Sequence, residues 1–250
     1  MLNILSARFQ QGFRTIKYPD APPTIPDRLR GLPVIRNGIC KNGCEECKNS
    51  CPTAAITCHE GIKIDLGRCI FCNSCVEACP TEALRFSNDH RLSVSNRADA
   101  IADSKGIKLA AQLEEKMRLL FGRSLNFRQV SAGGCNGCEV DINVLTTVVF
   151  DLSRFGIKIV ASPRHADGII ITGPVTENMK LALMKTYEAV PSPKLVIAVG
   201  ACAISGGIFR DHPEQHNGAS DILPVDLFIP GCPPHPVTIL DGLLRLIGKI

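Results

Sequence analysis

The stretch CKNGCEECKNSCP, residues 40–52, is repeated within the chain as CIFCNSCVEACP, residues 69–80. From the second cysteine onward each member lies 28 residues before its counterpart (44 to 72, 47 to 75, 51 to 79), and the flanks repeat as CPTAAI and CPTEAL. Three closely spaced cysteines can bind one corner of a four-iron cluster, but the fourth thiolate must come from elsewhere because a short loop cannot enclose a cube. The repeat therefore predicts a small domain that binds two [4Fe–4S] clusters.

The fourth cysteine of each run completes the other site in two-cluster ferredoxins. On this pattern the first cluster takes Cys40, Cys44, Cys47 and Cys79, and the second takes Cys69, Cys72, Cys75 and Cys51. Structural zinc is the competing interpretation, but zinc sites use cysteines in two pairs rather than as triplets with a distant fourth. Three residues, 41–43, separate the first two cysteines of the first run instead of two. We expect this extra residue to bulge the loop without removing a ligand.

The chain has 250 residues, 13 of them cysteine, and 45% apolar content. It shows neither a secretory leader pattern nor an apolar run long enough to cross a bilayer. Free thiolates then indicate a reducing compartment, so we expect a cytoplasmic protein or one peripheral on the inner face of the cytoplasmic membrane. The absence of tryptophan and the 5% aromatic content argue against a nucleic-acid surface. Without a Gly-rich phosphate loop we expect no nucleotide site.

Residues 1–37 carry six basic and two acidic side chains, a balance of +4 that equals the net charge of the whole chain. Apolar residues recur there at near-helical spacing: Leu2, Ile4, Leu5, Phe9, Phe13 and Ile16. Two interpretations stay open. In the first, the segment is an amphipathic helix that lies on a membrane surface or on an acidic partner. In the second, it is an arm that packs on partner subunits of this protein. Residues 18–37 hold five prolines and predict an extended strap.

The remaining chain divides into three segments. Residues 38–95 form the two-cluster domain, with short strands expected at 55–57 and 62–65. Residues 96–123 form a linker in which apolar spacing predicts a helix over 107–121, ended by Gly122. Residues 124–250 alternate strands (125–130, 157–161, 168–172, 194–199, 226–229) with helices (139–155, 177–190, 236–247). This alternation predicts a flavodoxin-like α/β domain, a parallel sheet covered on both faces.

Four further cysteines, Cys135, Cys138, Cys202 and Cys232, each follow an expected strand of the α/β domain. Ligands of open α/β sheets bind outside the carboxyl ends of the strands, so we expect the four thiolates to converge on one edge. Neighbouring glycines allow the backbone to approach a bulky cofactor, and helix N-termini favour an anionic one. The pattern favours a third [4Fe–4S] cluster over four unrelated buried cysteines or a thioredoxin-type pair.

Two stretches of this domain carry a family resemblance: SPRHADGIIITGPVT at residues 162–176 and LPVDLFIPGCPP at residues 223–234. They resemble the small subunit of [NiFe] hydrogenases and, equally, the 20 kDa subunit of respiratory complex I. The resemblance covers about residues 125–250. The N-terminal part resembles the ferredoxin-like subunit of formate hydrogenlyase and its complex I counterpart, so the chain resembles two neighbouring subunits fused into one.

The resemblance implies that Cys135, Cys138, Cys202 and Cys232 hold the cluster nearest a partner's active site. Asn136 and Gly137 separate the first two of these cysteines, as in the hydrogenases, whereas complex I proteins of this type have them adjacent. We therefore expect an electron-transfer subunit of an energy-converting-type [NiFe] hydrogenase, with three [4Fe–4S] clusters and no catalytic residue of its own. Its expected partners are the [NiFe] large subunit, further electron-transfer subunits and membrane subunits. The alternatives are a complex I-like module that feeds a quinone, and a ferredoxin-type docking subunit.

Three groups of residues remain outside these sites. Cys58, the thirteenth cysteine, is expected to be a structural thiol. Glu139 could relay protons at the boundary with a partner or favour the start of a helix. His165 and His235 lie in the family-like stretches, where either ring could simply satisfy local backbone groups.

Overall fold

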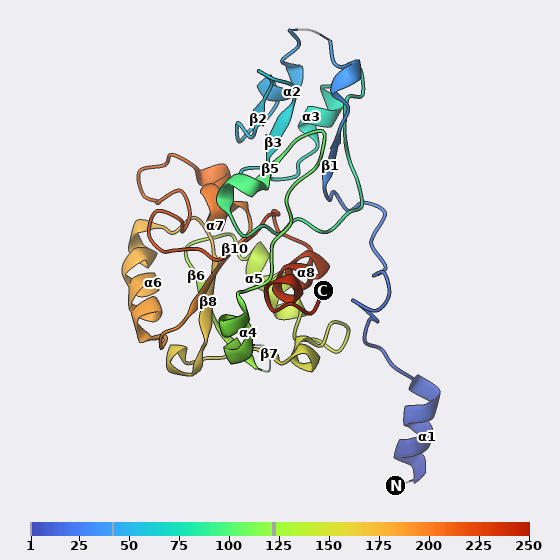
Figure 1. Ribbon diagram of the computed structural model, residues 1–250, viewed down its shortest axis with the longest axis vertical. Coiled ribbons are helices and arrows are strands. Elements are labelled where there is room, and N and C mark those ends of the chain that lie inside the picture. The colour runs from blue at the N-terminus through green and yellow to red at the C-terminus, as the bar shows by residue number, and fades with distance from the viewer. Residues whose placement is uncertain (1, 42, 122–123) are drawn as a thin grey trace.

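A parallel five-stranded sheet organises the C-terminal half of the computed structural model, which describes residues 2–41, 43–121 and 124–250 (Figure 1). Its strands are β6 (Leu125–Ser131), β7 (Ile157–Ile159), β8 (Gly168–Thr172), β9 (Leu195–Val199) and β10 (Leu227–Ile229). The spatial order is β7-β6-β8-β9-β10. This is the flavodoxin order 2-1-3-4-5, whose switch point lies between β6 and β8. The predicted fold class, a small N-terminal cysteine domain followed by a parallel-sheet α/β domain, is confirmed.

Helices cover both faces of this sheet. On one face α5 (Gly137–Val144) and α8 (Pro236–Leu246) pack on Ile170 and Ile197, and on the other α6 (Glu177–Ala189) packs on Ile169 and Val196. Every residue of β8 and β9 is buried, which is why both strands read as unbroken apolar runs. The short helix α7 (Ala201–Ser205) follows β9 directly.

The N-terminal cysteine domain forms a separate lobe above the α/β domain in Figure 1. Two four-residue helices, α2 (Glu46–Asn49) and α3 (Ser74–Glu77), carry the third cysteine of each run. Strand β1 (Pro33–Ile35) pairs with β4 (Leu84–Phe86), and β3 (Lys63–Asp65) lies between β2 (Ile56–Thr57) and β5 (Ile101–Ala102). The expected strands at 55–57 and 62–65 are confirmed within one residue at each end.

The linker differs from its prediction. Within the helix expected over 107–121, only α4 (Glu115–Phe121) is helical, whereas residues 107–114 run without helix. Their backbone bonds to neighbouring segments instead, because the amide of Ala110 donates to the Ser93 carbonyl and that of Leu113 to the Leu246 carbonyl. The apolar spacing of this segment reflects packing against both domains rather than one helical face. Gly122, expected to end the helix, and the side chain of Leu120 lie outside the described residues.

One helix of the α/β domain is shorter than its prediction over 139–155. Helix α5 ends at Val144, and a short 3-10 turn at Leu152–Phe155 follows Asp151, whose φ is +45°. The expected helices at 177–190 and 236–247 are confirmed within one residue at each end, whereas the five-residue α7 was not expected.

The N-terminal arm projects away from both lobes (Figure 1). Helix α1 (Leu2–Gln11) precedes Gly12, whose φ is +62°, so the expected helical spacing does not continue to Phe13 and Ile16. The chain joins the α/β domain where the Ile16 amide donates to the Val149 carbonyl and Tyr18 is buried. Among the helices that the structure describes, none combines the length and apolar character needed to cross a membrane.

Candidate iron–sulfur centres

The first cysteine run meets the last cysteine of the second run. Burial raises the pKa of the Cys40 thiol, and the charges of three neighbours raise it further: Cys44, Cys79 and Cys58. Burial also raises the pKa of Cys47 to about 12, with contributions from Cys58 and Cys79. The interaction between two charges weakens with their separation, so these contributions show that the Cys79 thiol is a near neighbour of the first run. The structure thus brings Cys79 into the group formed by Cys40, Cys44 and Cys47.

The second run shows the reciprocal arrangement. Burial raises the pKa of Cys69 to about 12, opposed by a hydrogen bond from Phe71 and aided by three thiols: Cys75, Cys51 and Cys72. Burial raises the pKa of Cys75 to about 11, and the charge of Cys51 contributes next, ahead of that of Cys72. Each fourth cysteine therefore lies beside the other run, as cross-ligation of two clusters requires. Ligation itself stays a prediction.

Backbone amides point at several of these sulfur atoms. The amide of Ala55 donates to Cys51 Sγ at 3.3 Å, and that of Ala83 donates to Cys79 Sγ at 3.2 Å, four residues on in both cases. Burial tends to raise the pKa of Cys79, but hydrogen bonds led by Thr81 and Ala83 leave it below its ordinary value. These donors stabilise thiolates, which is the form that binds iron.

The third group assembles at the carboxyl edge of the parallel sheet. Cys135 follows β6, Cys138 is the second residue of α5, Cys202 lies in α7 and Cys232 follows β10. All four line one cavity of about 100 Å³ at the sheet edge. Burial raises the pKa of Cys138, followed by the charge of Glu139 and then those of the other three thiols. The structure therefore brings together the four cysteines that the strand pattern placed at one edge, close to the switch point.

Glycine is required where the backbone meets these sulfurs. A Cβ on Gly200, whose φ is +88°, would lie 2.5 Å from Cys138 Sγ. A Cβ on Gly207 would lie 2.8 Å from Cys202 Sγ. Both contacts are shorter than real Cβ atoms show, so the thiols keep their positions only beside glycine. Four soft donors around a glycine-lined cavity fit a four-iron cluster.

The spacing of the thiols also bears on what they can bind. Within the part of the chain that the structure describes, no group of three His, Cys, Asp or Glu side chains is placed to hold one metal ion. A single zinc ion holds its sulfur ligands at about 2.3 Å and therefore draws them together. Four ligands of a cubane stand farther apart because the cluster lies between them.

Glu139 is buried beside the third group, with 5% of its surface exposed. Its Oε1 accepts hydrogen bonds from Ser131 Oγ and Thr172 Oγ1, both at 2.6 Å. These hydroxyls come from β6 and β8, so the carboxylate also ties the switch-point strands together. Its expected proton role stays a prediction. His235 Nδ1 accepts a hydrogen bond from the Val237 amide, so His235 caps the N-terminus of α8. This is the local backbone role that the sequence analysis gave as one possibility.

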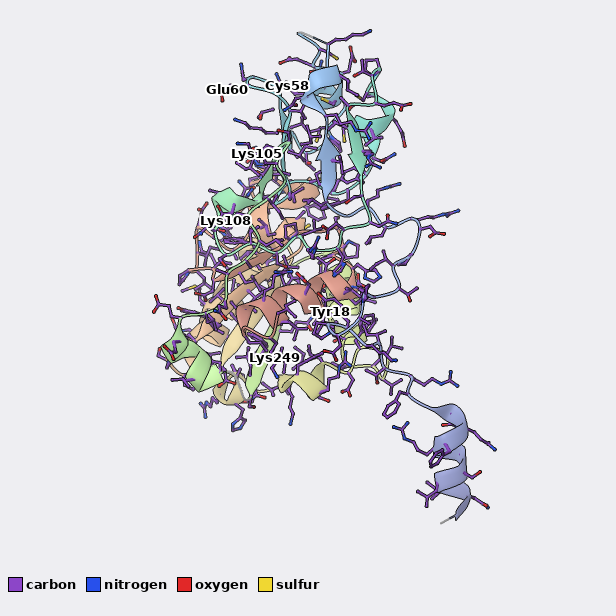
Figure 2. The ribbon with its side chains drawn as sticks, turned by 45° about the vertical axis from the view of Figure 1, so that its right-hand side comes forward. Tyr18, Cys58, Glu60, Lys105, Lys108 and Lys249 are labelled. Carbon is purple, nitrogen blue, oxygen red and sulfur yellow. The ribbon has the colours of Figure 1, made fainter. Side chains whose placement is uncertain are left out.

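Cys58 is the functional candidate that sequence reasoning left aside. Its Sγ lies 3.9 Å from Cys47 Sγ, inside the first group. Figure 2 shows it in the upper, N-terminal lobe beside Glu60, away from Tyr18 and Lys249 in the lower part of the molecule. A signal was available, because the internal repeat aligns Cys58 with Phe86, so the two halves differ at this position.

The second group is the one nearest the α/β domain. Ser205, at the end of α7, donates from its buried Oγ to the Gly67 carbonyl at 2.7 Å. Gly67 lies two residues before Cys69, and Cys202 lies three residues before Ser205. A second junction is a cavity of about 180 Å³ whose lining includes Phe71 from the second run and Pro233 beside Cys232. Helix α2, which carries Cys47 of the first group, lies in the upper part of the N-terminal lobe, away from the α/β domain (Figure 1).

Comparison with known proteins finds two family matches. Residues 135–246 match the family described as the NADH ubiquinone oxidoreductase 20 kDa subunit, and residues 62–85 match the 4Fe–4S binding domain. The first match contains all four cysteines of the third group. The second covers the whole second run, from Cys69 to Cys79, whereas the irregular first run lies outside it.

The curated relatives of the chain include hydrogenase-type and quinone-linked subunits. The probable membrane-bound hydrogenase subunit mbhJ of Pyrococcus furiosus is 42% identical over 142 residues, 56% of this chain and 85% of that protein. Formate hydrogenlyase subunit 7 of Escherichia coli is 42% identical over 155 residues, 59% of this chain but only 61% of that protein. An NADH-quinone oxidoreductase subunit of Citrifermentans bemidjiense is 49% identical over 113 residues, 45% of this chain and 66% of that protein. The resemblance inferred from the sequence motifs, to subunits of oxidoreductase complexes, is confirmed.

Proposed function

Because the chain belongs to the family of the NADH ubiquinone oxidoreductase 20 kDa subunit, we propose that it is the electron-transfer subunit of a multi-subunit [NiFe] hydrogenase. It relays electrons between a nickel–iron site in a separate large subunit and an external carrier. Three [4Fe–4S] clusters, each held by one of the three cysteine groups described above, supply the one-electron chemistry. The observation that carries the proposal is the convergence of Cys135, Cys138, Cys202 and Cys232 on one glycine-lined cavity.

The position of each cysteine group supports an order for the relay. Cys135 and Cys232 are exposed at the sheet edge, where a large subunit can dock close to the third group. The contact of Ser205 with the Gly67 carbonyl joins the third group to the second through a few residues. The first group, whose helix α2 lies away from the α/β domain, is left to face the external carrier. The chain's own residues bind and orient; the hydrogen chemistry belongs to the partner.

The exposed apolar side chains fit membership in a larger assembly. Val140 on α5 and Ile208 just after α7 are more than half exposed close to the third group. On the arm, Phe9 and Phe13 are 91% and 85% exposed. The first pair supports docking of the large subunit. The arm is available for the further partners, either membrane subunits or a membrane surface, in keeping with a peripheral cytoplasmic position.

A complex I-like module that passes electrons to a quinone is the second candidate. The relative named as an NADH-quinone oxidoreductase subunit, 49% identical over 113 residues, favours it. The two-residue spacer between Cys135 and Cys138 favours the hydrogenase. One experiment separates them: anaerobic purification of the native complex with nickel and iron quantified and hydrogen-dependent dye reduction assayed. The hydrogenase predicts nickel in a co-purifying subunit and about twelve irons per copy of this chain. Iron without nickel or hydrogen uptake would instead support the quinone-linked module.

A docking subunit without an electron-transfer role is tested by Cys72→Ser. The exposed Cys72 thiol belongs to the second group, and its replacement removes one expected ligand. The relay predicts that electron flow to the external acceptor stops while the complex still assembles. Unchanged electron flow in an assembled complex that has lost the second cluster would support the docking role.

A further inference from the structure

The first group contains five thiols for four ligand positions. Cys58 Sγ lies 3.9 Å from Cys47 Sγ, within hydrogen-bonding distance for sulfur. Cys58 also lines a cavity of about 330 Å³ together with Cys40 and Cys44. The charge of Cys79 contributes to the raised pKa of both Cys40 and Cys47. A cysteine that ligates iron as a thiolate has no proton to donate, so a hydrogen bond between these two sulfurs would run from Cys58 Sγ to Cys47 Sγ.

The local backbone holds the Cys58 side chain in this position. It directly follows β2, where Ile56 is buried and Thr57 is exposed. Successive side chains of an extended segment point to opposite sides, so Cys58 returns to the inward side of Ile56. Strand β2 is in turn paired with β3, through Ile56 with Ile64 and Thr57 with Lys63. The thiol is therefore held by the small sheet and not by a free loop.

The internal repeat provides a comparison within the same chain. Cys58 comes seven residues after Cys51, and Phe86 comes seven residues after Cys79. Phe86 packs its ring against Phe71, with the ring centroids 5.7 Å apart. The second half of the repeat thus has an apolar ring where the first half has an S–H donor. Two otherwise similar sites differ at this matched position.

Hydrogen bonds to the sulfur atoms of a cluster site raise its reduction potential, because they stabilise the extra negative charge of the reduced form. We propose that the Cys58 thiol donates to the Cys47 sulfur and thereby keeps the first cluster easier to reduce than the second. The inference rests on the proposed function, since it requires two clusters in the N-terminal lobe. Cys58 is a positioning residue in this scheme. It biases electrons toward the outer end of the lobe, where the external carrier is expected.

The test compares three variants of the full chain, purified anaerobically with its partners, by redox titration followed with electron paramagnetic resonance. Cys58→Ala and Cys58→Phe remove the donor, and the latter copies the second half of the repeat. Both are expected to lower the reduced-to-oxidised ratio of one N-terminal cluster at fixed potential by roughly fivefold, the effect of one modest hydrogen bond. For a one-electron couple, that fivefold change corresponds to a fall of about 40 mV in the reduction potential of the cluster. Cys58→Ser keeps a donor and is expected to retain most of the potential.

Phe86→Leu is the matched control, because it alters the equivalent position without adding or removing a donor. It is expected to leave the potential of the first cluster unchanged. The inference is overturned if Cys58→Ala leaves all potentials unchanged, or if Cys58→Ser behaves like Cys58→Ala. Loss of about four irons in Cys58→Ala also overturns it, because the thiol would then be a ligand. A wild-type chain with fewer than about twelve irons contradicts the proposed function instead.

Discussion

The N-terminal lobe and the α/β domain bring cysteines together in opposite ways. Nine cysteines of the lobe lie between residues 40 and 79, on short helices and loops whose own amides donate to the sulfurs. Four cysteines of the α/β domain are spread from residue 135 to residue 232, and only the order of the parallel strands makes them neighbours. The lobe therefore depends on local turn geometry, whereas the sheet edge depends on the whole domain and on glycine at the points of closest approach.

The substitution Gly200→Ala tests whether the sheet-edge cysteines depend on glycine at the point of closest approach, and it has the largest expected effect. The new Cβ would lie 2.5 Å from Cys138 Sγ at a backbone position with φ of +88°, so the sulfur must move. We expect loss of the third cluster alone, with iron falling from about twelve to about eight per chain. Iron analysis and electron paramagnetic resonance of the purified complex measure this directly.

Gly106→Ala is the control for backbone strain. Its φ is +94°, but the added Cβ meets only Leu32 Cδ2 at 3.8 Å. We expect a modest loss of stability, about 1 kcal/mol, with all the iron retained. If both variants lose the third cluster equally, strain and not the sulfur contact is responsible.

A second prediction concerns the clamp that joins the strap to the α/β domain. Asp241 is fully buried, accepts from Tyr18 Oη at 2.6 Å and binds Arg245 through Nε at 2.8 Å. Asp241→Asn leaves the Arg245 charge poorly compensated, so we expect the free energy of unfolding to fall by about 3–5 kcal/mol. The measurement is the midpoint of urea unfolding.

The control for the clamp is Glu188→Gln, which removes an exposed ion pair with Lys185. Such pairs contribute at most about 1 kcal/mol, so its midpoint should stay close to that of the unaltered chain. Equal midpoints for Asp241→Asn and the unaltered chain would show that the strap is not anchored by this carboxylate.

A third prediction concerns the N-terminal lobe, where Asp65 holds the loop before the second cysteine run. Asp65 binds Arg97 through two hydrogen bonds, at 2.7 and 2.8 Å, and accepts from the Gly67 amide at 2.9 Å. It thereby holds the loop before Cys69. Asp65→Asn should destabilise the lobe by about 1–3 kcal/mol and release the second cluster on mild warming before the third. Glu60→Gln, which breaks an exposed pair with Lys63, should release neither early.

The smallest expected effect is on pH dependence, through His90. Burial lowers the pKa of its ring, although nearby carboxylates oppose the shift. The groups around the ring are Tyr18, Asp241, Asp89, Arg91, Arg245 and His235. Above about pH 6.5 the ring is neutral in the folded and unfolded chain, so it adds no pH dependence. Below that pH the unfolded chain takes up the proton more readily, and the free energy of unfolding falls as pH falls.

His90→Gln should therefore flatten the dependence of the thermal midpoint on pH below about 6.5. His212→Gln, which alters an exposed ring, provides the comparison. An identical slope in His90→Gln and the unaltered chain would place the pH dependence in other groups.

The sequence alone determined the features that depend on close neighbours or on strand alternation. The cysteine runs and their repeat indicated cluster binding before any fold was known. Strand β8 matches its prediction over residues 168–172, because its apolar run needs only burial on both faces. The strand-end positions of Cys135, Cys138, Cys202 and Cys232 were also readable, since parallel strands share one carboxyl edge.

Only the tertiary structure decided the features made by segments far apart in the chain. Residues 107–114 show helical spacing but lie without helix, because their amides bond to segments such as Ser93 and Leu246. The hydrogen bond between Tyr18 and Asp241 joins residues 223 positions apart, and no local sequence pattern predicts it. The sequence predicts that Cys58 is a structural thiol, whereas the structure places it directly after strand β2 with its sulfur beside Cys47 Sγ. Local spacing encodes which side chains can share a face, whereas burial against distant segments decides which of them meet.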